Sequence, residues 1–200
     1  MAEPTDDGLL VWIDCEMTGL DPDTDQILEV SCLITTADLT LIDPTGYTAV
    51  VHTPSSRLAQ MDAWCTATHA SSGLTARVLA APADRATASA AAAGLLAYIR
   101  RWVPRARSAL LAGNSVHADR AFLRRGAWAP VVEYLHYRIL DVSAIKEAAR
   151  RWCAPEVLAG APRKTGTHRA REDILESIEE ARYYKDAIFG RVERKNGGSC

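Results

Sequence analysis

Two carboxylates stand one residue apart at the end of an apolar run near the start of the chain. Residues 9–13 are all apolar, and Asp14-Cys15-Glu16 follows directly. In a strand, residues two apart project from the same face, so Asp14 and Glu16 would point together while Cys15 faces the opposite layer. Close like charges are costly to bury unless a cation neutralises them, and magnesium or manganese prefer such oxygen ligands. Taken alone, an Asp-x-Glu pair is more often a solvated strand end.

Two further acids and a histidine stand where they can join this pair. Asp119 follows the turn at residues 113–115 at the start of an expected helix, and Asp173 falls in the first turn of the last expected helix. A single acid at a helix start is commonly a surface residue favoured by the helix dipole. His168 lies five residues before Asp173, and imidazole titrates near neutral pH. Each of these positions taken alone is weak evidence for a metal site.

The segments around these positions predict strands first and helices later. Short apolar runs bounded by Asp, Pro and Gly turns predict a three-strand antiparallel meander. Amphipathic or alanine-rich runs that end near Pro or Gly predict helices. The expected strands are residues 9–13, 27–35, 47–52, 109–112 and 138–140, and the expected helices are residues 88–103, 118–126, 146–153 and 170–188.

This order of elements predicts an α/β fold, in which a mixed central sheet with an antiparallel three-strand meander is flanked by helices. Residues 9–189 are expected to form a single domain. Residues 1–8 and 190–200 are expected to be flexible ends, because terminal polar and glycine-containing segments are seldom held in place.

Composition favours a soluble globular protein over a membrane, secreted or disulfide-rich one. The 200 residues are 48% hydrophobic and 24% charged, which fits one soluble globular domain. No apolar run approaches the roughly 20 residues that span a bilayer, and residues 1–7 are acidic where a secretory signal is basic. The five cysteines are widely spaced without a Cys-x-x-Cys pair, which argues against a disulfide framework or a zinc knuckle. We therefore expect a cytoplasmic protein with reduced thiols and no membrane partner.

Charge is distributed unevenly along the chain. Eleven acidic residues precede the first cation, Arg57, while the cations concentrate between Arg100 and Arg171. This split can place an acidic, cation-binding pocket beside a basic surface that receives an anion. The net charge of −2 leaves little room for the extended basic groove that long single strands require.

Three blocks of the sequence resemble the signature motifs of the DEDDh exonuclease family. They are residues 13–21, IDCEMTGLD; residues 113–115, GNS, with Asp119; and residues 168–174, HRAREDI. Residues 61–64, 68–74 and 136–143 make the match closest to the oligoribonucleases within that family. Together the blocks span most of residues 9–189 in the expected order.

The resemblance implies a ribonuclease H-like exonuclease fold and 3′-to-5′ hydrolysis of very short oligoribonucleotides, especially dinucleotides, to mononucleotides. It places the metal ligands on Asp14, Glu16, Asp119 and Asp173, and the general base on His168. Two divalent cations, Mg²⁺ or Mn²⁺, would share the scissile phosphate, one lowering the pKa of the attacking water and the other stabilising the leaving oxygen.

The resemblance also implies how the terminal bases are held. Leu20 and Trp64, with Tyr137 donated by a second subunit, would wedge and stack them. Stacking on aromatic faces tolerates any base sequence. A closed homodimer is implied as well, in which Tyr137 and Arg138 complete the partner's site.

A small polar cap for the 5′ phosphate is implied on Ser115, Arg138 and Ser143. An arginine fork and hydroxyl donors suit a phosphate group. The residue after Ser143 is often threonine in this family and is Ala144 here, which removes a hydroxyl from the cap.

Three other interpretations compete with this one. A DEDDh enzyme that trims or proofreads longer chains would share all the motifs. A non-catalytic nucleotide-binding module could keep the fold, although the presence of four acids and the histidine speaks against it. A structural zinc protein is disfavoured because the cysteine and histidine spacings are wrong.

Overall fold

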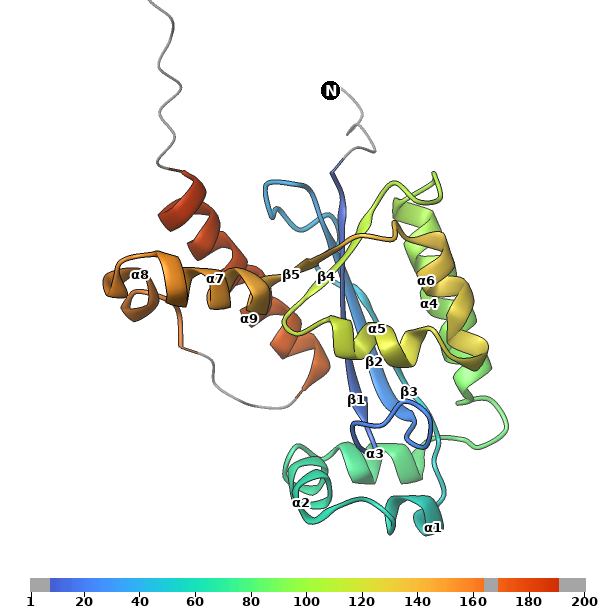
Figure 1. The fold of residues 1–200 in the computed structure, drawn as a ribbon. Helices are drawn as coiled ribbons and strands as arrows, with labels where there is room; N and C mark the ends of the chain where they lie inside the picture. The colour runs from blue at the N-terminus through green and yellow to red at the C-terminus, as the bar shows by residue number, and fades with distance from the viewer. Residues whose placement is uncertain (1–7, 164–168, 191–200) are drawn as a thin grey trace, which may run out of the picture.

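The computed structural model (Figure 1) describes residues 8–163 and 169–190 and is built on a five-stranded sheet with the order β3-β2-β1-β4-β5. β1 (Leu10–Met17), β2 (Ile27–Thr35) and β3 (Tyr47–Val50) are antiparallel neighbours. β4 (Leu110–Gly113) runs parallel to β1, and β5 (Ile139–Asp141) runs parallel to β4. The predicted mixed sheet with an antiparallel meander is confirmed.

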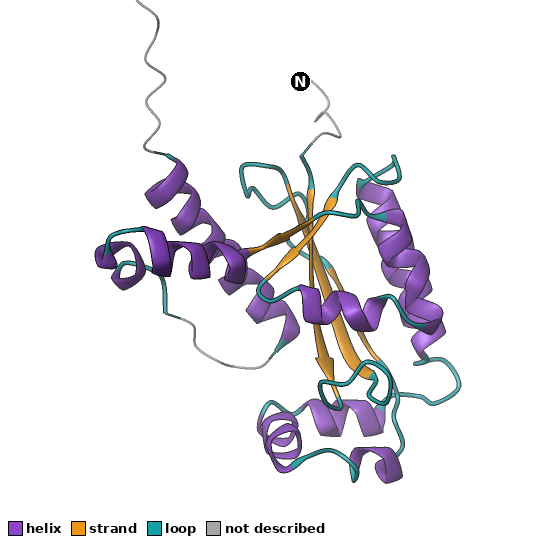
Figure 2. Cartoon of the chain, in the orientation of Figure 1, coloured by secondary structure: helices purple, strands orange, loops and turns teal. Residues whose placement is uncertain are grey.

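β1 lies at the centre of the sheet and supplies both cores. Val11, Ile13 and Cys15 face a core that includes residues of α4 (Ala88–Trp102), α5 (His117–Leu123) and α6 (Ala129–Tyr134). Leu10 and Trp12 face a second core with α7 (Val142–Trp152) and α9 (Ala170–Tyr184). Figure 2 shows these two helical layers on either side of the strands. The strand period of two therefore directs Asp14 and Glu16 towards the α9 layer.

The two longest helices occupy the predicted segments. The Thr87 hydroxyl caps α4 by accepting a hydrogen bond from the backbone N–H of Ala90 at 3.1 Å, and Pro104 stands just beyond its end. α9 continues into a short π-helical turn, η2 (Lys185–Phe189), so the whole segment matches the expected helix at residues 170–188.

Other boundaries differ from the prediction for local reasons. β1 extends four residues past the apolar run, because β2 continues to pair with it as far as Met17 and Ile27. α7 starts at Val142 rather than 146, because the Asp141 carboxylate accepts a hydrogen bond from Ser143 N at 3.0 Å and caps the helix. α5 ends at Leu123, and β3 ends at Val50.

Several short helical elements were not predicted. α1 (Ser55–Leu58), α2 (Ala63–Ser71) and α3 (Leu74–Ala80) form a module beside the end of β1, and Leu58, Leu74 and Val78 pack on Leu28 of β2. The others are α6, α8 (Pro155–Ala159) and the 3₁₀ turn η1 (Gly126–Trp128), which leads into α6. Each spans too few turns to show a clear apolar period.

Four cysteines in the described ranges, Cys15, Cys32, Cys65 and Cys153, are free. Across the same ranges no helix combines the length and apolar character needed to cross a membrane. The flexible ends expected at residues 1–8 and 190–200 lie almost entirely outside the described residues.

Candidate active site

Three acids from two distant parts of the chain meet on the α9 side of the sheet. Asp14 and Glu16 project from β1, and Asp173 lies in the first turn of α9, which packs over β1 and β2. One carboxylate oxygen from each lies within 4.8 Å of the other two. An all-oxygen set of this compactness fits a hard divalent cation such as Mg²⁺ or Mn²⁺. The site can therefore hold a metal ion.

The electrostatics of Glu16 reflect this crowding. Burial and then the negative charges of Asp173, Glu29 and Asp119 raise the pKa of Glu16 to about 7. Its carboxyl group is therefore only partly ionised near neutral pH in the absence of a cation. Proton and metal compete for the same oxygens.

Asp119 approaches the same place from the opposite layer. It is buried in the first turn of α5, and its Oδ1 accepts a hydrogen bond from the backbone N–H of Cys15 at 2.9 Å. Burial raises the pKa of Asp119 to about 7, against the lowering effect of that hydrogen bond. The structure thus brings Asp119 to β1 between Asp14 and Glu16, but outside the three-carboxylate group.

A fourth acid on the same face is neutralised by an arginine. Glu29 of β2 pairs with Glu16 in the strand register, is buried, and forms an ion pair with Arg77 of α3. A second hydrogen bond, from Arg77 Nη2 to Glu29 Oε2, is 3.2 Å long. The Arg77 charge also lowers the pKa of Glu16, against the larger effects that raise it. This pair could not be predicted from the sequence, because it depends on the register of β2 and the docking of α3.

His69 also lies at the cluster, although its sequence context favours a structural or surface role. The buried ring bonds through Nε2 to the carbonyl oxygen of Met17 at 2.8 Å, and its Nδ1 lies 3.8 Å from Glu16 Oε2. Because a carbonyl only accepts, Nε2 carries the proton of that bond. Residues 68–74, which form part of the family resemblance, were the available signal. His168, the expected general base, lies outside the described residues.

The two expected stacking residues stand out from the surface. Leu20 is 85% exposed in the β1–β2 loop, and Trp64 is 61% exposed in the first turn of α2. Large apolar side chains this exposed are suited to contact a ligand. Leu20 lines a groove of about 580 Å³ together with polar residues of the loop, Arg57 of α1 and Asp62, which caps α2.

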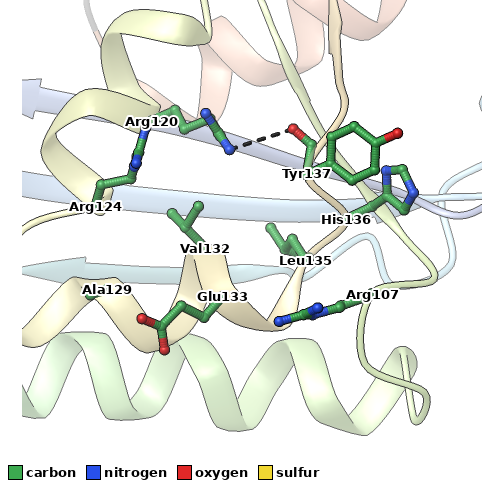
Figure 3. A pocket seen from close by; sticks show the side chains of 9 residues that line it. All are labelled: Arg107, Arg120, Arg124, Ala129, Val132, Glu133, Leu135, His136 and Tyr137. Atoms are coloured by element: carbon green, nitrogen blue, oxygen red, sulfur yellow. Dashed lines mark hydrogen bonds between the residues drawn. The ribbon is translucent and has the colours of Figure 1, made fainter.

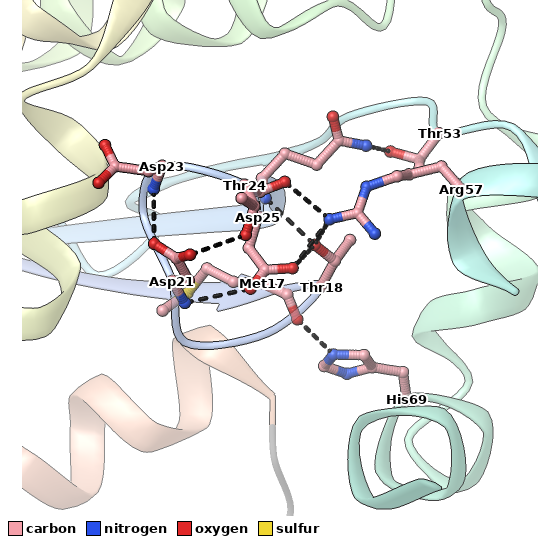
Figure 4. A network of polar contacts seen from close by, with 10 residues as sticks. Met17, Thr18, Asp21, Asp23, Thr24, Asp25, Thr53, Arg57 and His69 are labelled. Atoms are coloured by element: carbon pink, nitrogen blue, oxygen red, sulfur yellow. Dashed lines mark hydrogen bonds and ion pairs between the residues drawn. The ribbon is translucent and has the colours of Figure 1, made fainter. Parts of the chain in front are cut away.

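A polar network holds the loop that carries Leu20 (Figure 4). The Thr18 hydroxyl donates to Asp25 Oδ1 at 2.7 Å, and Arg57 of α1 donates through Nη2 to Asp25 Oδ1 at 2.8 Å and to Thr24 O at 2.9 Å. These hydrogen bonds and the Arg57 charge lower the pKa of Asp25 against the effect of its burial. Leu20 is therefore presented from a fixed loop.

The two serines expected in the phosphate cap lie together at the ends of β4 and β5. Ser115 Oγ and Ser143 Oγ are 3.1 Å apart, and Ser143 Oγ donates to Asn114 Oδ1 at 3.0 Å. Asp141 Oδ1 accepts from the backbone N–H groups of Ser115 and Ser143. Asp141 thereby orders the pair, which its sequence position did not reveal.

Tyr137 and Arg138 stand apart from the cluster of their own chain. Tyr137 is 69% exposed, and the Arg138 guanidinium lies 5.3 Å from the centre of its ring. The register across β1, β4 and β5 aligns Ile139 with Val11, which puts Arg138 level with Leu10. At roughly 3.3 Å per residue, Asp14 and Glu16 lie about 13 to 20 Å further along the strand direction.

Comparison with known proteins shows which family the chain resembles. The family model described as exonuclease (RNase_T) matches residues 11–181. The chain is 47% identical to an oligoribonuclease of Aliivibrio fischeri over 180 residues, covering 90% of this chain and 95% of that protein. It is 47% identical to an oligoribonuclease of Pectobacterium atrosepticum over 182 residues, covering 90% of this chain and 96% of that protein.

Solved structures support the fold. The zinc-bound complex of Escherichia coli exonuclease I with single-stranded DNA superposes with a TM-score of 0.63 at 13% identity, covering 91% of this chain and 41% of that longer chain. This likeness supports the predicted ribonuclease H-like exonuclease fold. From the family match and the relatives together, the chain belongs to the exonuclease family and, within it, to the oligoribonucleases, and is therefore a nuclease.

Proposed function

We propose that this chain is a 3′-to-5′ exoribonuclease that hydrolyses very short oligoribonucleotides, especially dinucleotides, to mononucleotides. The observation that carries the proposal is the meeting of Asp14, Glu16 and Asp173 within 4.8 Å. Relatives at 47% identity that are named oligoribonucleases support the choice of substrate.

Asp14, Glu16 and Asp173 would hold two Mg²⁺ or Mn²⁺ ions, with Asp119 as the fourth ligand. Bound divalent ions supply the charge that lowers the pKa of an attacking water and stabilises the leaving 3′-oxygen. The chain holds the oxygens in place through the β1–β2 register and through the Cys15 N–H bond to Asp119. The Arg77–Glu29 ion pair offsets the charge of the acid that pairs with Glu16 in the strand register.

His168 would take the proton of the attacking water. Its position five residues before Asp173 supports this role, because α9 begins at Ala170 and sets Asp173 against β1. A general base contributes roughly 10²- to 10⁴-fold to the rate of proton transfer chemistry.

Leu20 and Trp64 would stack the terminal bases, each contact contributing on the order of 1 to 3 kcal/mol. Ser115 and Ser143 would hold the 5′ phosphate. Tyr137 and Arg138 would complete the site of a second copy, and their distance along the strands from their own Asp14 and Glu16 supports this. In a two-fold symmetric homodimer, each subunit would complete the site of the other. The expected cytoplasmic location stays a prediction.

The experiment is a time course on a 5′-labelled tetranucleotide RNA with Mg²⁺, with EDTA, and with the Asp14→Ala variant. A 3′-to-5′ exonuclease gives successively shorter labelled products, and EDTA or Asp14→Ala abolishes them. Immediate release of labelled mononucleotide would contradict the direction. Activity that survives EDTA would contradict the metal site, and no cleavage in Mg²⁺ or Mn²⁺ would favour a non-catalytic binding module.

A further inference from the structure

Polar side chains outside the carboxylate cluster gather in a pocket of α5 and α6 and in a buried group next to the phosphate cap. In the pocket, Arg120 donates through Nη2 to Tyr137 O at 3.4 Å, so this surface adjoins the segment proposed to complete the partner's site (Figure 3). The buried group consists of Asn114, Lys146, Ser177 and Glu180. Glu180 is only 1% exposed, and the proposed reaction gives it no role. Because a buried charge is costly unless it is paired, the partners of Glu180 indicate what it does.

Glu180 sets the orientation of the Asn114 side-chain amide. Its Oε2 accepts a hydrogen bond from Asn114 Nδ2 at 3.0 Å. Ser177 Oγ lies 2.9 Å from the same nitrogen and donates its own proton to Asp173 O. An ionised carboxylate only accepts hydrogen bonds, so the amide nitrogen must face Glu180 and the amide oxygen must face the other way. Glu180 therefore decides which atom of Asn114 meets Ser143.

The orientation of Asn114 is passed on to the phosphate cap. Asn114 Oδ1 accepts the hydroxyl proton of Ser143 at 3.0 Å, and Ser143 Oγ in turn accepts from Ser115 N at 3.0 Å and from Ser115 Oγ at 3.1 Å. The φ of Ser115 is +50°, a conformation uncommon for a residue with a side chain, so these bonds help to hold its backbone. The exposed Ser115 hydroxyl ends the chain of bonds. Its proton can turn to a phosphate oxygen while the other bonds remain.

Lys146 links the helix that carries Ser143 to the helix that carries Glu180. It lies three residues after Ser143 in α7, and its Nζ is 3.3 Å from Glu180 Oε1. The lysine charge offsets the cost of burying the carboxylate. Each oxygen of Glu180 therefore has a partner, one on α7 and one at the end of β4, and the two partners flank Ser143 along the network.

We propose that Glu180 and Lys146 are positioning residues for recognition of the 5′ phosphate, because they orient Asn114 and thereby the Ser143 and Ser115 hydroxyls. This inference rests on the proposed function, since it requires that the cap binds that phosphate. Neither residue needs to touch the substrate. Their loss should therefore lower the preference for a 5′-phosphorylated substrate, a quantity that a merely stabilising ion pair would leave unchanged.

The test compares kcat/KM for the dinucleotide pApA with kcat/KM for ApA, which lacks the 5′ phosphate, in the same Mg²⁺ buffer. The pApA-to-ApA ratio should fall about tenfold in Glu180→Gln, in line with the loss of a hydrogen bond to a charged group. Glutamine keeps the shape of the side chain, but it cannot pair with Lys146 and can turn its own N–H₂ towards Asn114. Ser115→Ala should lower the ratio at least as far.

The matched control is Glu179→Gln. Glu179 is the exposed neighbour of Glu180 on α9 and pairs with Arg182, so its replacement removes the same charge from the same helix. The pApA-to-ApA ratio of this variant should equal that of the unmodified chain.

Lys146 alters the same ion pair from its more exposed end, which provides a second variant if Glu180→Gln folds poorly. Lys146→Gln should lower the ratio, and Lys146→Arg, which keeps the charge, should retain most of it. In the double variant of Glu180→Gln with Lys146→Gln, the ratio should be no lower than in the weaker single variant, because both changes act through one pair.

Equal losses of activity on pApA and ApA in Glu180→Gln would reduce the pair to a structural role and overturn the inference. Effects of the two changes that multiply would also overturn it, because Lys146 would then act on the phosphate by itself. A preference for pApA that survives Glu180→Gln would overturn the inference and leave the proposed cap standing. A ratio near one in the unmodified chain would contradict the cap and the inference together.

Discussion

The carboxyl groups of Asp14, Glu16 and Asp173 lie close enough that they cannot all be ionised at low cost without a cation. Asp119 adds a fourth charge from the other layer, offset by one backbone N–H. Repulsion between these carboxylates lowers the stability of the metal-free protein, and a bound cation relieves this repulsion. The free energy of unfolding of the metal-free protein should therefore depend on pH.

The pKa values of Glu16 and Asp119 are both raised to about 7, from ordinary values of 4.5 and 3.8. Between about pH 4 and 7 the metal-free folded protein therefore binds more protons than the unfolded chain. Its free energy of unfolding should fall as pH rises through this window. Urea denaturation in EDTA at pH 5 and at pH 7.5 measures this decrease in the free energy of unfolding. The Glu16→Gln variant should make the decrease smaller by on the order of 2 kcal/mol.

The matched control for this pH dependence is Glu156→Gln, an exposed acid in α8. It should leave the difference between pH 5 and 7.5 unchanged. Excess Mg²⁺ should stabilise the protein more at pH 7.5 than at pH 5, because deprotonated carboxylates bind the cation. A free energy of unfolding that rises from pH 5 to 7.5 in EDTA would contradict the crowding of these acids.

The His168→Ala variant tests whether His168 is the general base. Turnover should drop by roughly 10²-fold or more, since proton removal from water loses its acceptor. Mg²⁺ affinity, measured by calorimetry, should stay within a few-fold, because the carboxylates remain. Full activity near neutral pH in this variant would show that another group takes the proton.

At the scale of elements, the β1–β2 loop and α1 act as a unit that presents Leu20. Arg57 contacts Thr18, Thr24 and Asp25 of that loop, so Arg57→Ala should release it. KM for a dinucleotide should rise about tenfold, in line with the loss of a charged hydrogen bond, with a smaller change in kcat. Arg57→Lys should restore part of the loss, and Arg85→Ala should have no effect. An unchanged KM in Arg57→Ala would mean that the loop holds its shape without this contact.

Elements with a clear periodicity could be predicted, and those fixed by tertiary contacts could not. β2 is apolar or buried at every position and was predicted to the residue, and α4 and α9 carry caps or long apolar stripes. α3 is short and is held by docking on Leu28 and by the Arg77–Glu29 pair, and α2 packs on α3 and bonds through His69 to the carbonyl oxygen of Met17. No local pattern encodes those contacts.

The same division holds for the candidate site. Spacing alone favoured a solvated strand end for Asp14 and Glu16, and the resemblance to the DEDDh exonucleases selected them together with Asp173; the structure brings the three together. The burial of Asp119 and the approach of His69 to Glu16 depend on how α5 and α2 dock on the sheet. The role of Asp141 could not be predicted, because its carboxylate orients the backbone of Ser115 and Ser143 and does not itself contact a ligand in the proposed site.

At the scale of the whole molecule, the proposed homodimer predicts complementation between two inactive variants. Asp14→Ala lacks a working cluster but can donate Tyr137, while Tyr137→Ala keeps the cluster and lacks the donated ring. Co-expression should restore one of the two sites in each mixed dimer. With random pairing, activity should return to about one quarter of the unmodified level.

The control pair for complementation is Asp14→Ala with Asp173→Ala, which damage the same cluster and should remain inactive together. If co-expressed Asp14→Ala and Tyr137→Ala give no more activity than the sum of the two variants measured separately, Tyr137 acts within its own chain or has no role in catalysis.

The proposed enzyme acts on very short RNA. One measurement tests it directly: kcat/KM for a 5′-labelled RNA dinucleotide beside a 5′-labelled 20-mer, with Mg²⁺ and the same enzyme preparation. A cap of Ser115 and Ser143 that closes on the 5′ phosphate of a dinucleotide predicts a higher value for the dinucleotide, by about tenfold or more. A strong preference for the 20-mer would contradict the account and assign the chain to enzymes that trim longer RNA.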